Sequence, residues 1–226
     1  MHCAKCGKRA EHIDPATGDT LCINCLQTTV KRRFLKGLRR ANPRRDDKVI
    51  IACRADTQSL FTLKTMIEVE KNYPVSLEVI ELAKIPFCLD FCKKTNINYK
   101  FIEADYKTYT GFRLALTDKI NQQRNDVLIV MPDVLEDIAA YFLGEVLLGD
   151  IRGLSLDASF RVAYPSAFLS YRTLAFLEPE LIGSLSSLYL NSGAKVLLEE
   201  FARYHSTLVF SSVKMFYKLV NILREA

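Results

Sequence analysis

Four cysteines near the beginning of the chain form two pairs, Cys3 with Cys6 and Cys22 with Cys25, and each pair has two residues between its members. Fifteen residues separate the two pairs. Thiolates at this spacing are typical ligands of a tetrahedral structural zinc ion, because each pair places two sulfur atoms on one side of the metal. The spacing therefore predicts a zinc knuckle over residues 1–29. The alternative is a set of free or redox-active thiols.

Two histidines lie in the same segment as the cysteines. His2 and His12 could each replace a cysteine as a zinc ligand, but neither stands at a spacing that favours this role. We expect both side chains to be exposed. Turn-forming residues at 14–19 provide the tip of the loop between the cysteine pairs.

Basic residues are concentrated directly after the predicted knuckle. Residues 31–48 contain nine lysines and arginines against two aspartates, a net charge of +7, whereas the whole chain carries +5. The remainder of the chain is therefore slightly acidic. A local run of this kind is typical of a surface that contacts nucleic-acid phosphates. The candidate phosphate-binding residues are Lys31, Arg32, Arg33, Lys36, Arg39, Arg40, Arg44 and Arg45.

An apolar stripe runs through this basic segment. Val30, Phe34 and Leu38 recur at every fourth residue, which predicts a helix with one apolar face and basic residues on its other faces. Pro43 marks its end. We interpret residues 30–47 as a basic helix and linker that directs its charges toward nucleic-acid phosphates. The alternative is a solvated helix whose charge serves only solubility.

From residue 48 onward, apolar strand patterns alternate with helical patterns, which predicts a doubly wound α/β domain over 48–226 with a parallel sheet. The expected strands are 49–53, 77–80, 99–102, 127–130 and 161–164. The expected helices are 56–73, 87–94, 110–122 and 133–148, and the chain from residue 170 is expected to be mostly helical. Ligands of such sheets bind at the carboxyl ends of the strands.

The turn after the first strand of this domain lacks the glycines that let backbone N–H groups approach a phosphate. It consists of Arg54, Ala55, Asp56, Thr57, Gln58 and Ser59. Asp56 would place a negative charge where a phosphate would bind, so we interpret it as the N-cap of the following helix.

Two other groups of candidate residues have structural explanations. Asp133 and Glu136 have the spacing of a capping box at the start of a helix. Cys88 and Cys92 lie four residues apart on a helical pattern beside phenylalanines, so we expect both to be core residues. The three histidines form no motif with a nucleophile, which leaves no hydrolase constellation in the sequence.

Length and composition are those of a globular protein with one main domain. Hydrophobic residues make up 49% of the 226 residues and charged residues 25%, so disorder is not expected. No stretch is long and apolar enough to suggest a membrane span. The zinc-like cysteines and the absence of a signal peptide favour a cytoplasmic location.

The knuckle, the basic helix and the first strand together resemble the tRNA 2-thiolation proteins, in segments 3–6, 21–26, 30–40 and 48–52. Active members of that family carry a Ser-Gly-Gly-Lys-Asp-Ser loop that binds ATP and adenylates the wobble uridine, U34. Of that loop this chain keeps only Ser59. In a second motif of active members, Gly-His-Asn-x-Asp-Asp, the glycine and histidine are replaced by Pro132 and Asp133.

The resemblance implies an adenine nucleotide alpha hydrolase-like fold of the PP-loop type. It also implies that the chain is the second, non-catalytic subunit of the cytosolic thiolation complex, a pseudoenzyme. On this interpretation the protein binds structural zinc but neither ATP nor an Fe–S cluster. Its partners would be tRNA, a catalytic subunit with an intact loop in a heterodimer, and a ubiquitin-like sulfur carrier reached through the complex.

Two alternatives remain. The first is an active ATP-dependent tRNA sulfur transferase with an atypical loop, which turnover of ATP to AMP on tRNA would reveal. The second is a zinc-ribbon nucleic-acid-binding protein of another class, for which duplex DNA would bind as tightly as tRNA at equal salt.

Overall fold

The computed structural model describes residues 1–71, 75–120, 127–146, 149–179 and 206–225. Five parallel strands form its main sheet in the order β5-β4-β3-β6-β7. The strands are β3 (Lys48–Cys53), β4 (Ser76–Ala83), β5 (Asn98–Glu103), β6 (Val127–Val130) and β7 (Arg161–Ala163). The prediction of a doubly wound parallel sheet is confirmed, with each expected strand in its place.

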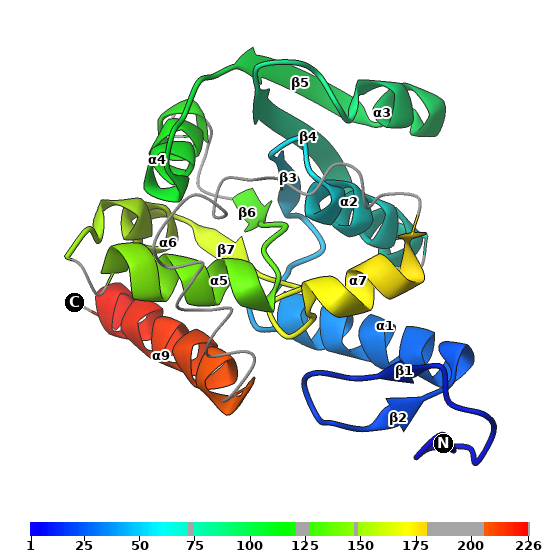
Figure 1. Ribbon diagram of the computed structural model, residues 1–226. Helices are drawn as coiled ribbons and strands as arrows, with labels where there is room; N and C mark the ends of the chain where they lie inside the picture. Colours follow the sequence, from blue (N-terminus) through cyan, green and yellow to red (C-terminus); the bar gives the residue numbers. More distant parts are fainter. Residues whose placement is uncertain (72–74, 121–126, 147–148, 180–205, 226) are drawn as a thin grey trace.

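Helices cover both faces of the sheet (Figure 1). One face carries α4 (Tyr109–Ile120), α5 (Leu135–Tyr141), α6 (Ser155–Ser159) and α9 (Ser206–Glu225). The other carries α1 (Ile23–Arg39), α2 (Thr57–Glu70), α3 (Leu89–Thr95) and α7 (Tyr171–Leu177). Side chains alternate along β3, so Ile50 packs into the first core and Ile51 into the second. Burial on both faces explains why the strands read as continuous apolar runs.

The predicted boundaries need adjustment at two helices. α1 begins at Ile23 rather than at Val30, because Leu26 extends the apolar stripe by one turn, and Cys25 therefore lies in the first turn of the helix. α5 is short and continues as a π-helical turn, Phe142–Val146. A 3-10 turn, Arg152–Leu154, then leads into α6. Both α7 and α9 agree with the helical expectation after residue 170, while residues 180–205 lie outside the described part.

The N-terminal segment folds as a small antiparallel hairpin of β1 (His12–Ile13) and β2 (Thr20–Leu21) beside α1 (Figure 1). Asp14, in the hairpin loop, accepts hydrogen bonds from both terminal nitrogens of Arg33, at 2.6 and 3.0 Å. The hairpin also contacts α7, where the Nε2 atom of His12 lies 3.3 Å from the hydroxyl of Thr173. These contacts join the cysteine segment to the α/β domain.

The expectation that His12 is exposed is wrong. Its side chain is only 7% exposed, and its ring packs against Phe176 at a centroid distance of 4.9 Å. Burial lowers the pKa of His12, and the positive charge of Arg172 lowers it further, whereas Asp14 acts in the opposite direction. His2, by contrast, is exposed as expected.

No described helix is both long and apolar enough to cross a membrane. α1 lies close to the sheet domain at Gly37, where an added Cβ atom would be 2.7 Å from the carbonyl oxygen of Pro165. A larger residue could not occupy this position without a shift of backbone, so glycine at this point permits the contact between α1 and the segment after β7.

Candidate functional site

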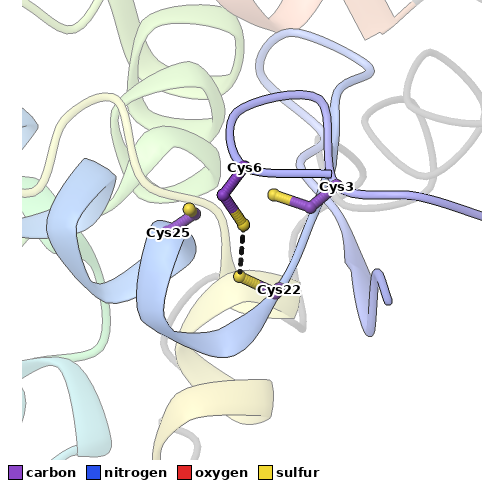
Figure 2. Close-up of side chains that lie close together, drawn as sticks. All are labelled: Cys3, Cys6, Cys22 and Cys25. Carbon is purple, nitrogen blue, oxygen red and sulfur yellow. Dashed lines mark hydrogen bonds between the residues drawn. The ribbon is translucent and has the colours of Figure 1, made fainter. Parts of the chain in front are cut away.

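The four N-terminal thiols converge on one point (Figure 2). The Sγ atoms of Cys3, Cys6, Cys22 and Cys25 all lie within 4.8 Å of one another. Cys6 and Cys22 are 3.5 Å apart, close to the edge of about 3.8 Å in a tetrahedron with Zn–S bonds of 2.3 Å. The donors therefore fit a single tetrahedral ion, and the segment could form a zinc knuckle.

Protonation of these thiols is uneven. Backbone N–H groups, chiefly that of Cys22, lower the pKa of Cys3 to about 6, although burial opposes the shift. Hydrogen bonds from Cys25 to Cys6 and Cys22 raise the pKa of Cys25 to about 12. A metal ion bound by the four sulfur atoms would replace the protons of these thiols.

The basic residues of α1 and the following turn fall into two classes. Lys31, Arg32, Lys36 and Arg39 are exposed and lie on one face of the helix, and Arg44 and Arg45 are exposed beyond it. Arg33 is instead held by Asp14. Arg40 is exposed as well, but its guanidinium stacks over the rings of Phe168 and Tyr217, at 4.7 and 5.0 Å from their centroids. Arg33 and Arg40 thus serve contacts within the protein.

A buried ion-pair network occupies the turn after β3. The guanidinium of Arg54 donates to Asp56 at 2.9 Å, to Asp133 at 2.7 Å and to Asp137 at 3.1 Å, and all four side chains are 0% exposed. As the sequence indicates, Asp56 is the N-cap of α2 and accepts from the backbone N–H of Ser59 at 2.8 Å. A carboxylate already occupies this helix N-terminus.

The remaining residues of the turn are tightly placed. Ala55 adopts a left-handed conformation with φ of 59°, which glycine would adopt at lower cost. Thr57 is buried, and the amide of Gln58 donates to the hydroxyl of Tyr171 at 2.6 Å. The hydroxyl of Ser59 accepts from the backbone N–H of Arg54 at 2.9 Å. Hydrogen bonds between the side chains of the turn and its own backbone therefore hold the turn in this conformation.

The predicted capping box at Asp133 and Glu136 is wrong. α5 begins at Leu135 with Val134 as N-cap, and the carboxylate of Asp137 accepts from the N–H of Val134. Asp133 instead faces Arg54. Burial raises the pKa of Asp137 to about 6, while the charge of Arg54 acts against this shift. The sequence could not show this role, because Arg54 and Asp133 are 79 residues apart.

An open cavity lies next to this network. It has a volume of about 300 Å³ and is formed where β3, β4 and β5 end. Its lining consists of Arg54, Ala55, Ala83, Lys84, Ile85, Ala104, Asp105 and Tyr106. The ammonium of Lys84 is 3.2 Å from a carboxylate oxygen of Asp105, and both side chains are largely exposed. The cavity occupies the sheet edge where ligands of this fold class bind.

Comparison with known proteins shows the fold. The chain is similar to the U34-tRNA thiolase NcsA from Methanococcus maripaludis, solved with its [4Fe-4S] cluster. The TM-score is 0.75 at 18% sequence identity, over 98% of this chain and 87% of that one. An NH3-dependent NAD synthetase from Campylobacter jejuni is similar at a TM-score of 0.46 and 11% identity, over 88% of this chain and 96% of that one.

No protein-family model matches the chain. No curated protein matches it either. The similar thiolase supports the expected PP-loop fold, and it does so over the knuckle as well as the sheet domain, because nearly the whole chain is covered.

Two expectations from the sequence are contradicted by this comparison. The similar protein is a thiolase, an enzyme, so the prediction of a pseudoenzyme is wrong. That thiolase also carries a [4Fe-4S] cluster, so the prediction that no such cluster is to be expected is wrong as well. Four thiols are a donor set that both zinc and iron–sulfur clusters use, and the N-terminal group could bind a metal. The missing glycines of the loop led to the prediction of a pseudoenzyme.

Proposed function

We propose that this protein is an ATP-dependent tRNA sulfur transferase that 2-thiolates the wobble uridine and has an atypical phosphate loop. The observation that carries the proposal is the likeness to a U34-tRNA thiolase over 98% of this chain. The exposed cations of α1 and the cavity at the carboxyl ends of β3, β4 and β5 support it, since the reaction needs a tRNA surface and a nucleotide site.

The proposed chemistry has two steps. In the first, O2 of the uridine attacks the α-phosphorus of ATP, pyrophosphate leaves, and N3 of the uracil ring loses its proton. In the second, a hydrosulfide attacks C2, AMP leaves with the former O2, and the proton of the hydrosulfide ends on N3. The products are 2-thiouridine, AMP and pyrophosphate, and the sulfur donor is a co-reactant.

This chain would position the nucleotide beside the closed turn. Asp56 caps α2, so the phosphates cannot take the helix N-terminus and would lie toward the mouth of the cavity. Lys84 lies there, and its exposed pair with Asp105 costs little to break. The Lys84 ammonium could then pair with the phosphates, while Ala83 and Ala104 leave room for a base at the strand ends.

The test is a reaction of the purified chain with ATP, sodium sulfide and a tRNA transcript that has uridine at position 34. We expect AMP and 2-thiouridine in equal amounts, measured by chromatography and mass spectrometry. A transcript with cytidine at position 34 is the matched control, and NcsA is the positive control. No AMP and no 2-thiouridine, under conditions where NcsA is active, would refute the proposal.

A variant separates the nucleotide site from the tRNA surface. Lys84→Ala should raise the KM for ATP by about tenfold, the loss of one charged contact, without changing tRNA affinity. Lys93→Ala, an exposed lysine at the end of α3, is the control and should change neither. Tight binding of duplex DNA at equal salt would instead favour a general zinc-ribbon nucleic-acid-binding protein.

Partners and location stay predictions. The family resemblance predicts association with a second thiolation chain that has an intact Ser-Gly-Gly-Lys-Asp-Ser loop, and delivery of sulfur by a ubiquitin-like carrier. The zinc-like cysteines are the basis for the predicted cytoplasmic location. Affinity purification of the chain from its native source, with identification of co-purified proteins, would test the first two.

A further inference from the structure

A second group of metal-ligating side chains lies inside the sheet domain, apart from the N-terminal cysteines. The ligand atoms of Cys53, Glu81 and Cys88 all lie within 4.8 Å of one another. Their side chains are almost completely buried, with exposures of 1%, 0% and 0%. Cys53 ends β3, Glu81 is its direct partner in the register of β4, and Cys88 precedes the first residue of α3. Two paired strands therefore hold Cys53 and Glu81, and the start of α3 brings Cys88 to them.

The carboxylate of Glu81 is completely buried. Within the described part of the chain, no basic side chain forms an ion pair with it. A buried carboxylate beside two buried thiols, with no basic side chain paired to it, is an environment that favours a bound metal cation.

Hydrogen bonds orient the carboxylate of Glu81 but do not use all of its acceptor positions. Its oxygens accept from the backbone N–H groups of Phe87 and Cys88, at 2.8 and 3.0 Å, and from the hydroxyl of Tyr99 at 2.5 Å. A carboxylate offers about four acceptor positions, so one position stays available for a metal. Contacts of this kind fix the direction of a ligand in known metal sites.

We propose that Cys53, Glu81 and Cys88 form a second metal site, which takes a borderline divalent cation of the zinc type. Two thiolates and a carboxylate are a ligand set that zinc accepts, and the fourth position is left for water or an external ligand. The metal would replace the protons of the two thiols. This site is separate from the N-terminal knuckle and does not depend on the proposed thiolation activity.

Metal can reach the site through the loop between β4 and α3. Lys84, Ile85, Pro86 and Phe87 are all exposed, and Ile85 has 75% of its surface exposed. The loop leads directly into Cys88, and α3 has only seven residues. Local opening of so short and exposed a segment costs less free energy than opening the sheet.

The stoichiometry of cobalt binding tests the proposal. Metal-free, reduced full-length protein is titrated with Co2+ under anaerobic conditions, and thiolate-to-cobalt charge-transfer absorption counts the sites. We expect two Co2+ ions per wild-type chain and one in Cys53→Ala and in Cys88→Ala. Cys92→Ala is the matched control, since Cys92 is as buried as Cys88 but lies outside the group, and it should keep two. One Co2+ per wild-type chain, unchanged in Cys53→Ala, would overturn the proposal.

Two further measurements cover variants that fail to fold. In a Cys22→Ser background, which removes the knuckle site, one Co2+ should still bind, and Glu81→Gln should weaken that binding by about tenfold or more. In the wild-type chain, Zn2+ should slow alkylation of Cys53 and Cys88 but not of Cys92, as measured by mass spectrometry of the peptides. Equal slowing of all three would reflect general stabilisation and would contradict the site.

Discussion

Arg54 donates from Nη1 to Oδ1 of Asp133 over 2.7 Å, and this buried ion pair connects the turn after β3 with the turn after β6. The same guanidinium also binds Asp56 and Asp137, so one cation holds three carboxylates at the carboxyl edge of the sheet. These ion pairs stabilise the turn of residues 54–59, which matches the phosphate-binding loop of the thiolation proteins that the sequence resembles. Arg54 and Ala55 line the cavity, so the ion pairs of Arg54 hold this side of the cavity in place.

Arg54→Ala should reduce the free energy of unfolding by about 3–5 kcal/mol, because it leaves buried carboxylates without their cation. Urea denaturation followed by circular dichroism measures the change. Arg152→Ala is the matched control, since Arg152 forms an exposed pair with Asp150. That variant should lose no more than about 1 kcal/mol. Equal effects of the two variants would show that the Arg54 network contributes little.

Gly37→Ala should destabilise the protein by about 1–3 kcal/mol, because the new methyl group would lie 2.7 Å from the carbonyl oxygen of Pro165 and would push α1 away. Thermal unfolding measures the shift. Gly111→Ala, in the first turn of α4, serves as control, because its methyl group would meet only the side chains of Thr108 at 3.3 Å and Tyr106 at 3.5 Å. A normal melting temperature for Gly37→Ala would mean that α1 can move at no cost.

Much of the fold could be predicted from local patterns. The run Val127–Val130 is apolar at every position, as strands buried on both faces are, and the same holds for most of β3. The paired spacing of the four N-terminal cysteines was enough to predict that their thiols meet. The earlier start of α1 was also within reach, since Leu26 continues the stripe of Val30 and Phe34.

The parts that could not be predicted depend on contacts between distant segments. Glu81 lies directly after the expected strand 77–80, and only the longer β4 and its register with β3 place it beside Cys53. Arg54 stands at the position of the first serine in the loop of the resembling family, and nothing near it in the chain indicates Asp133. His12 reads as exposed because its burial is produced by α7, more than 150 residues away.

Docking of the N-terminal hairpin should weaken as the pH falls. Because the folded-state pKa of His12 lies below its ordinary value, the unfolded chain binds a proton first, and stability is lost as the pH drops below about 6.5. Proteolysis within the hairpin should be faster at pH 5.5 than at pH 7.5. His12→Gln, which cannot be protonated, should show no such difference, and an equal difference in that variant would assign the effect to another group.

Cys22→Ser should lose the N-terminal metal and loosen the hairpin while the sheet domain stays folded. Leu26, Val30 and Phe34 keep α1 packed on the sheet, so the change should be confined to residues before Ile23. Metal content by mass spectrometry and hydrogen exchange of backbone amides measure both effects. Full metal retention at the N-terminal group would show that other ligands are used there.

The exposed cations of α1 should carry tRNA binding, whereas Arg33 should not. Arg32→Glu combined with Lys36→Glu removes two phosphate contacts and adds two negative charges on the exposed helix face, so tRNA affinity should fall at least about tenfold and its salt dependence should become flatter. Filter binding at several salt concentrations measures both. Arg33→Gln is the matched control: Arg33 is engaged by Asp14, so its loss should loosen the hairpin and leave the salt dependence nearly unchanged. A flatter salt dependence in Arg33→Gln alone would mean that Arg33 leaves Asp14 to reach the RNA.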